Sequence, residues 1–100
     1  MRRDDTRRTI VAYDIPNDRR RTRISKVLAK YGDRIQYSVF VVDCSPARLL
    51  RLKDEISDEI VKSEDSILFC DLGKIKELKE TKYSYLGLSK DITDNDMLIL

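Results

Sequence analysis

One aspartate stands where a strand is expected to end, directly before a segment dense in arginine. Residues 9–14 run Thr-Ile-Val-Ala-Tyr-Asp, an apolar stretch that closes on the carboxylate of Asp14, and Pro16 then interrupts it. Residues 19–23 follow as Arg-Arg-Arg-Thr-Arg. Carboxylate oxygens bind divalent cations, and guanidinium groups bind phosphate oxygens in pairs. The pattern therefore indicates a site where a metal ion could meet a polyanion.

Positive charge is concentrated in the first third of the chain. Residues 1–34 carry 11 Lys/Arg against 5 Asp/Glu, whereas residues 35–100 carry 9 against 13. Nine of the first eleven cations are arginine. Such an asymmetry favours a partner that carries phosphate, although a solvated helix face accounts for it equally well.

The chain contains no histidine, and this absence excludes several kinds of catalysis. Ser-His-Asp and Cys-His mechanisms and histidine-containing zinc sites all require an imidazole. Any hydrolysis must therefore use carboxylates, a metal ion and water. The two cysteines, Cys44 and Cys70, form no Cys-x-x-Cys pair and are expected to be buried free thiols in a reducing compartment.

The length of 100 residues suits one domain with a two-layer core. No apolar run approaches the roughly 20 residues that span a bilayer. The N-terminal residues, Met-Arg-Arg-Asp-Asp-Thr-Arg-Arg, lack the apolar core of a secretory signal. A cytoplasmic protein without a membrane partner is therefore expected.

Two helices are predicted from apolar residues at helical spacing. The first covers about residues 18–31, with Asn17 or Asp18 as its cap and Gly32 as the residue that ends it. The second begins at Ser45-Pro46, a strong helix start, and continues to about Lys62. The outer face of the first helix carries a set of cations that we predict to bind nucleic acid: Arg19, Arg20, Arg23, Lys26 and Lys30.

Strands are predicted on either side of these helices. Residues 9–14 and 66–72 are expected to form buried strands, and residues 34–43 form either one bent strand or two short ones. With two strands in the middle, the order becomes βαββαβ. This order favours an α+β, ferredoxin-like two-layer sandwich with both helices on one face of the sheet, and the uncovered face points to a dimer.

The chain is thus expected to have three parts. Residues 1–8 form a flexible basic arm, residues 9–73 the ferredoxin-like core, and residues 74–100 a C-terminal extension. Within this extension Tyr83, Tyr85 and Leu86 alternate as a short strand does. The apolar end, residues 97–100, is expected to form an extra strand in its own sheet or a partner's.

Taken in order, these residues resemble the CRISPR-associated protein 2 family. The resemblance rests on residues 13–18 at the end of the first strand, the arginine-rich helix, residues 34–40 and residues 64–67 before the last core strand. It covers roughly residues 9–73. It implies a ferredoxin-like homodimer that acts in CRISPR spacer acquisition. Such a dimer bridges the CRISPR integrase, CRISPR-associated protein 1, and holds the incoming DNA duplex.

The resemblance also implies a metal-dependent endonuclease that cuts single-stranded RNA or double-stranded DNA, with Mg²⁺ or Mn²⁺ as cofactor. By matching position, Asp14 is the metal-binding acid. The other positions implied in cleavage are Tyr13, Arg21, Arg23, Arg34 and Phe40.

One aspartate gives Mg²⁺ few oxygen ligands, so the implied site needs a second copy of Asp14 across a two-fold axis. Two carboxylates about 4 Å apart repel by roughly 4 kcal/mol at an effective dielectric near 20, and a shared cation relieves this repulsion. The competing interpretation makes Asp14 a strand-end acid bonded to N–H groups of the next turn. A non-catalytic DNA-binding adaptor and a stand-alone ribonuclease toxin remain the alternative functions.

Overall fold

The computed structural model describes residues 5–78 and 82–89. The chain forms, in order, β1 (Arg7–Asp14), α1 (Asp18–Ala29), β2 (Gly32–Gln36), β3 (Val39–Cys44), α2 (Pro46–Glu59), β4 (Ser66–Lys74) and a short 3-10 helix (Ile75–Glu77). The predicted βαββαβ order is confirmed. Residues 34–43 belong to two strands, because residues 37 and 38 form the turn between β2 and β3.

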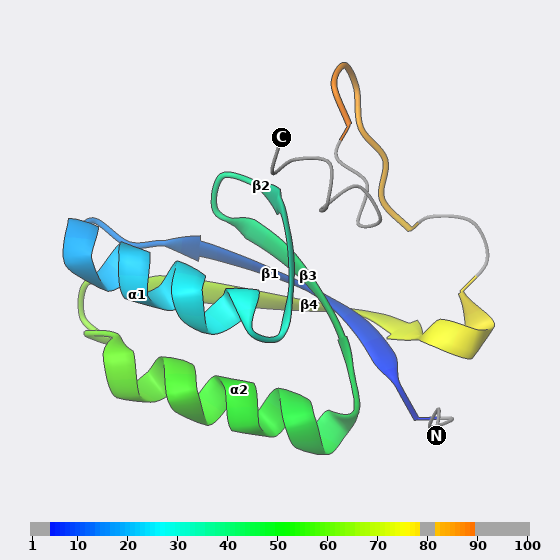
Figure 1. Ribbon diagram of the computed structural model, residues 1–100, viewed down its shortest axis with the longest axis horizontal. Coiled ribbons are helices and arrows are strands. Elements are labelled where there is room, and N and C mark those ends of the chain that lie inside the picture. The colour runs from blue at the N-terminus through cyan, green and yellow to red at the C-terminus, as the bar shows by residue number, and fades with distance from the viewer. Residues whose placement is uncertain (1–4, 79–81, 90–100) are drawn as a thin grey trace.

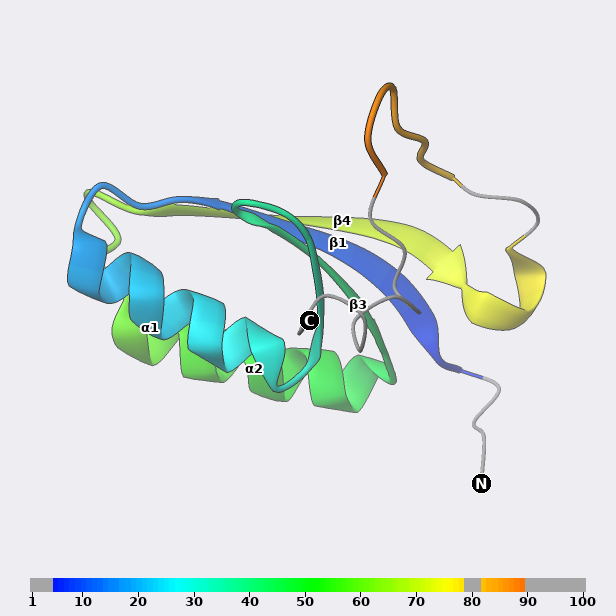
Figure 2. The ribbon, with the colours of Figure 1, turned by 45° about the horizontal axis from the view of Figure 1, so that its top comes forward.

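The four strands form one antiparallel sheet in the order β2-β3-β1-β4. Both helices lie on the same face of this sheet, and the other face is left open (Figures 1 and 2). This arrangement is the predicted ferredoxin-like two-layer sandwich. No helix of the described residues is long and apolar enough to cross a membrane.

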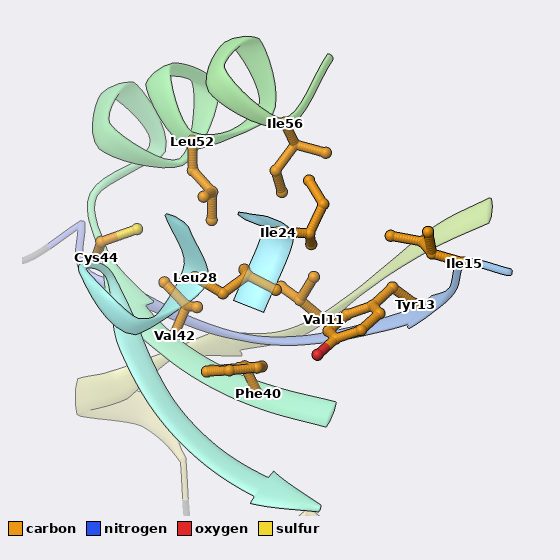
Figure 3. Packing of buried hydrophobic residues seen from close by; sticks show 10 residues of the cluster. All are labelled: Val11, Tyr13, Ile15, Ile24, Leu28, Phe40, Val42, Cys44, Leu52 and Ile56. Atoms are coloured by element: carbon orange, nitrogen blue, oxygen red, sulfur yellow. The ribbon is translucent and has the colours of Figure 1, made fainter. Parts of the chain in front are cut away.

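The core lies between the sheet and the two helices (Figure 3). On β1, Val11 and Tyr13 face the helices because side chains alternate along a strand. Helix α1 contributes Ile24 and Leu28, and the partly buried Val27 of α1 and Tyr31, just after the helix, pack against them. From α2 and β3 come further large buried side chains of this cluster, which are Leu52, Ile56, Phe40 and Val42.

Both helix starts follow the expected capping chemistry. The Asn17 side chain accepts a hydrogen bond from the Arg20 amide, and the Ser45 side chain accepts one from the Arg48 amide. The helix ends differ from the predictions. Helix α1 stops at Ala29, and α2 stops at Glu59 rather than near Lys62.

Gly32 has a different role from the predicted one. It is the first residue of β2, and its backbone does not adopt a positive φ angle, so it is not the residue that ends α1 in a left-handed turn. A Cβ atom at this position would lie 2.1 Å from the carbonyl oxygen of Val41. The close approach of β2 to β3 therefore requires a glycine here.

Two strands are longer than predicted. β1 begins at Arg7, so Arg7 and Arg8 of the predicted arm lie in the sheet. β4 continues through Gly73, whose φ of 115° favours glycine, and the pairing with β1 shifts its register between Arg8 and Thr9. Residues 83–86 form no strand, contrary to the prediction. The expected strand at residues 97–100 lies outside the described residues.

The open face of the sheet is largely apolar. The strand register places Ile10 beside Val41 and Cys70, and Ala12 beside Val39 and Leu68. Leu68 is 62% exposed, and Cys70 is exposed rather than buried as predicted. Alternation puts Cys70 on the face without helices, whereas Cys44 faces the core. Residues 82–89 rise on this open side (Figure 2) and line hollows there together with Ile35 and Val39.

Candidate nucleic-acid interface

Asp14 ends β1 with its side chain exposed. It follows the inward-facing Tyr13, so alternation directs its carboxylate to the side away from the helices. Within residues 5–78 and 82–89 the carboxylate receives no hydrogen bond and makes no ion pair. The interpretation that turn N–H groups bind this carboxylate is therefore not supported, and Asp14 is available to a ligand.

A polar pocket of about 210 Å³ lies on the helix side of the same strand end. Its walls come from the end of β1, from α1, and from β2 and the turn after it. The lining residues are Tyr13, Arg21, Thr22, Ser25, Arg34 and Tyr37. The fold thus brings together three of the predicted cleavage residues, Tyr13, Arg21 and Arg34.

Arg21 is held in place by backbone and side-chain contacts. Its Nη1 donates to the Ile15 carbonyl oxygen at 2.7 Å, and its Nη2 contacts the Asp18 carboxylate one turn earlier. The hydrogen bond to Asp18 is the main reason why the pKa of Arg21 is raised, and Tyr37 adds a smaller contribution. Because Asp18 is largely exposed, solvent weakens this ion pair.

Arg34 lies across the sheet register from Phe40, and its guanidinium carbon lies 5.3 Å from the centre of the Phe40 ring. Phe40 in turn stacks on Tyr13, with 6.4 Å between the ring centres. Burial raises the pKa of the Tyr13 hydroxyl, while the charge of Arg34 opposes this rise. Phe40 is only 2% exposed. It can therefore influence the pocket through Arg34 and Tyr13 rather than by contact with a large ligand.

Arg20, one of the predicted nucleic-acid-binding cations, has carboxylate partners within the chain. Its Nε and Nη2 donate to the two oxygens of Asp65 at 2.7 and 3.0 Å, and Nη2 also reaches Glu64 at 2.9 Å. Asp65 is buried and also accepts a hydrogen bond from the Val61 amide. Arg20 thereby joins α1 to the loop before β4.

The other cations of this set divide into two groups. Arg23 pairs with Glu59 at 2.8 Å and Lys30 pairs with Glu55 at 3.0 Å, so α2 partly neutralises both. Arg19 and Lys26 are exposed and make no ion pair with any described residue. Arg23 points to α2 and lies apart from the pocket residues.

A metal site is not complete in the described part of one chain. Residues 5–78 and 82–89 contain no group of three or more Cys, Asp or Glu residues that could hold a metal ion. Asp14 provides a single carboxylate. The described donor set therefore fits a divalent cation only if a second molecule or a nucleic acid supplies further oxygen ligands.

Three pocket residues were not predicted to belong to the site. On α1, Ser25 lies four residues after Arg21 and three residues after Thr22. Helical spacing from Arg21 could therefore have identified Ser25, and spacing from Ser25 could have identified Thr22. Tyr37 lies in the β2–β3 turn. The sequence did not specify this position, because residues 34–43 could have formed one strand or two. The partner of Arg20 was missed because Asp65 lies 45 positions further along the chain.

The sheet order and the two helices on one face define a ferredoxin-like two-layer protein, here with an arginine-lined pocket and a free aspartate at the end of β1. The sequence profile of the family described as CRISPR associated protein Cas2 matches residues 7–80. The chain belongs to this family.

Curated relatives agree with this assignment. A protein of Synechocystis sp. named CRISPR-associated endoribonuclease Cas2 3 is 40% identical over 64 residues, which cover 64% of this chain and 70% of that relative. A protein of the same name from Thermodesulfovibrio yellowstonii is 36% identical over 86% of this chain and 93% of its own length. For a relative from Thermus thermophilus the match spans 60% of its length.

Solved structures show the same fold. Cas2 of Streptococcus pyogenes has a TM-score of 0.63 and 28% identity, with 74% of this chain and 98% of the other covered. A hypothetical protein from Thermus thermophilus reaches a TM-score of 0.74 at 27% identity, over 85% of this chain and 95% of the other. A chain of a partial Cas6-RT-Cas1–Cas2 complex has a TM-score of 0.62 and 31% identity, over 82% of this chain and 95% of the other.

Proposed function

We propose that the chain acts in CRISPR spacer acquisition as a homodimer that binds nucleic acid together with a Cas1-type integrase, and that it also cleaves nucleic acid in a metal-dependent reaction. The observation that carries the proposal is that the exposed Asp14 carboxylate ends β1 directly after Tyr13, which lines the pocket that holds Arg21 and Arg34. The endoribonuclease names of the curated relatives support cleavage. The similarity to a chain of the Cas1–Cas2 complex supports the integrase partnership.

The open sheet face supports the homodimer. Ile10, Leu68 and Val39 present an apolar surface that the helices do not cover. Burying such a surface against a second copy stabilises the pair, because contact removes apolar area from water. Asp14 lies at the end of β1 on the same side. A two-fold axis through this face would bring two Asp14 carboxylates towards each other.

Asp14 and its counterpart in the second copy would hold the Mg²⁺ or Mn²⁺ ion, with nucleic-acid oxygens and water as further ligands. A bound divalent ion supplies a hydroxide for attack on a phosphodiester and stabilises the charge that develops. The chain's own task is to position the substrate. Arg21 and Arg34 offer fixed donors to phosphate oxygens, and the Asp14 carboxylate has no partner among the described residues.

The cleavage part of the proposal is tested with single-stranded RNA and duplex DNA across Mg²⁺ and Mn²⁺. Asp14→Asn removes the charge with little change in shape and should abolish cleavage, since rate losses of about a hundredfold or more follow loss of an essential site carboxylate. Asp58→Asn, at an exposed acid of α2, is the matched control and should leave cleavage unchanged. Absence of cleavage by the unmutated protein under all of these conditions contradicts this part.

A non-catalytic adaptor is the second candidate function. It is favoured because, within one chain, no three acidic or thiol side chains of the described residues are placed to hold a metal ion together. The two functions are separated by a spacer-acquisition assay on Asp14→Asn. Normal acquisition without cleavage assigns the essential role to nucleic-acid binding. Loss of both shows that Asp14 itself is required for acquisition.

A further inference from the structure

Asp14 and Ser66 stand opposite each other where β1 ends and β4 begins, and both residues are exposed. We propose that the Ser66 hydroxyl helps to hold the divalent cation of the Asp14 site, by accepting a hydrogen bond from a water molecule bound to the ion. In this role Ser66 is a positioning residue, because it acts on the ion through water. The inference rests on the metal-dependent reaction proposed above and adds a neutral oxygen to the single carboxylate of each chain.

The antiparallel register sets the distance between the two side chains. Asp14 and Ser66 are direct partners in the pairing of β1 with β4. The Cβ atoms of such partners lie about 4.5–5.5 Å apart. A carboxylate oxygen binds Mg²⁺ at about 2.1 Å, and a water on the ion extends the reach by a hydrogen bond of about 2.8 Å. The Ser66 hydroxyl therefore lies within reach of a water on an ion that Asp14 holds.

Both side chains face the open side of the sheet. On β1 the neighbouring Tyr13 belongs to the core, so Asp14 points away from the helices. On β4 the neighbouring Ile67 packs against the core, so Ser66 points to the same open side. A second copy covers this face in the proposed homodimer. A two-fold axis there would bring two carboxylates and two hydroxyls to one site.

The acids that precede Ser66 in the sequence bind an arginine of α1 instead. The Asp65 side chain is fully buried and accepts two hydrogen bonds from Arg20, at 2.7 and 3.0 Å. Glu64 accepts a third from the same guanidinium at 2.9 Å. These bonds fix the segment that leads into β4. They leave the Ser66 hydroxyl, rather than either of these carboxylates, beside Asp14.

A hydroxyl suits this position better than another carboxylate does. The Ser66 hydroxyl makes no hydrogen bond with any described residue, so its donor and its acceptor lone pairs are available. Mg²⁺ keeps several of its waters when one or two carboxylates bind it. A neutral oxygen can order one of these waters without adding to the repulsion between the two Asp14 carboxylates.

The test uses Mn²⁺ alone as the probe and measures its binding to the full chain by electron paramagnetic resonance of the free ion. Asp14→Asn should abolish binding at this site. Ser66→Ala should weaken binding about tenfold, as loss of a residue that orients the ligands of a metal does. Ser66→Thr keeps the hydroxyl and should bind nearly as tightly as the unmutated chain. Ser57→Ala, at an exposed serine of α2, is the matched control and should leave binding unchanged.

Ser66→Asp gives an opposite expectation. A carboxylate directly opposite Asp14 repels it in the absence of a cation, so the melting temperature without Mn²⁺ should be lower than that of Ser66→Ala. Mn²⁺ should then raise the melting temperature of Ser66→Asp more than that of the unmutated chain, because a ligand stabilises the folded state according to its affinity. Melting temperatures without Mn²⁺ also show whether Ser66→Ala and Ser66→Thr remain folded.

Two results overturn the role of Ser66 and leave the metal site of Asp14 in place. One is unchanged Mn²⁺ affinity in Ser66→Ala when Asp14→Asn has lost it, and the other is a Mn²⁺ effect in Ser66→Asp no larger than in the unmutated chain. If the unmutated chain binds no Mn²⁺, or if Asp14→Asn binds it normally, the metal-dependent part of the proposed function is wrong as well. If both Asp14→Asn and Ser66→Ala lose Mn²⁺ affinity while the unmutated chain cleaves neither RNA nor DNA, the role of Ser66 is supported and cleavage is wrong.

Discussion

Arg20 and Arg21 are neighbours in sequence and have opposite roles in the structure. Arg20 turns inward and meets two carboxylates, one of which, Asp65, has a fully buried side chain. Arg21 turns to the pocket and is held by a carbonyl oxygen and one exposed acid. An arginine-rich helix therefore contains residues that hold the fold together and residues that face a ligand. The acids that come near each arginine in space, rather than the arginine itself, decide which role it has.

The largest expected effect comes from breaking the internal arginine. Arg20→Ala leaves the Asp65 carboxylate buried and without its cation, which is among the costliest changes a folded protein can undergo. We expect the melting temperature to fall by roughly 10 °C. The measurement is thermal unfolding followed by circular dichroism. Arg21→Ala, the matched control one residue along, should change the melting temperature much less, and equal losses would contradict the comparison.

The second expectation concerns the stability of the folded chain at low pH. The hydrogen bond from Arg20 holds the pKa of Asp65 below its ordinary value, so the charged form is favoured in the folded state. The contribution of Asp65 is complete above the ordinary aspartate pKa of about 4 and is lost as pH falls through the lower folded value. The urea concentration at the unfolding midpoint of the unmutated chain should therefore decrease once the pH is lowered below about 4.

Asp65→Asn should be less stable near neutral pH and should lose less on acidification, because it has no proton to gain. Glu55 and Asp71 also have lowered pKa values, caused chiefly by hydrogen bonds from Tyr31 and Arg7 respectively. Part of the dependence of the urea midpoint on pH will therefore remain in Asp65→Asn. If the urea midpoint of Asp65→Asn changed with pH as it does in the unmutated chain, Asp65 would be excluded as a source of acid sensitivity.

The smallest expected effect concerns the outer cations of α1. Replacing Arg19 and Lys26 by Gln removes two charges that no described acid neutralises. If both contact phosphates, the slope of log affinity for duplex DNA against log salt should fall by about 1.8. Arg23→Gln and Lys30→Gln together, at cations paired with Glu59 and Glu55, should reduce the slope less. Titrations at several salt concentrations measure both double variants.

The fold could be predicted from the sequence because its signals are local. Apolar spacing located α1 and α2, Asn17 and Ser45 marked their starts, and β-branched residues marked the strands. The ends of the elements were predicted less accurately. Gly32, for example, allows β2 to lie close to β3 and does not end the helix. The exposure of Cys70 depends on which face of the sheet carries the helices, and a short apolar run does not specify this.

The site could be predicted only in part. The pattern of residues 9–23 singled out Asp14, the family resemblance added Tyr13, Arg21 and Arg34, and the structure places these residues at one end of the sheet. Their roles stay predictions. The division of the arginines into paired and unpaired ones was not predictable, because Glu59, Glu64 and Asp65 are distant in sequence and reach α1 only in the folded chain.

The short link between α1 and β2 has a consequence for how this chain can vary. Only residues 30 and 31 separate the helix from Gly32, which is pressed against the backbone of β3. Side chains alternate along a strand, so one residue inserted between Gly32 and Arg34 would carry Arg34 to the opposite side of the sheet while Gly32 keeps its place against β3. The contact of Gly32 with β3 therefore fixes the side on which Arg34 stands, and we expect an insertion after Gly32 to disrupt the pocket.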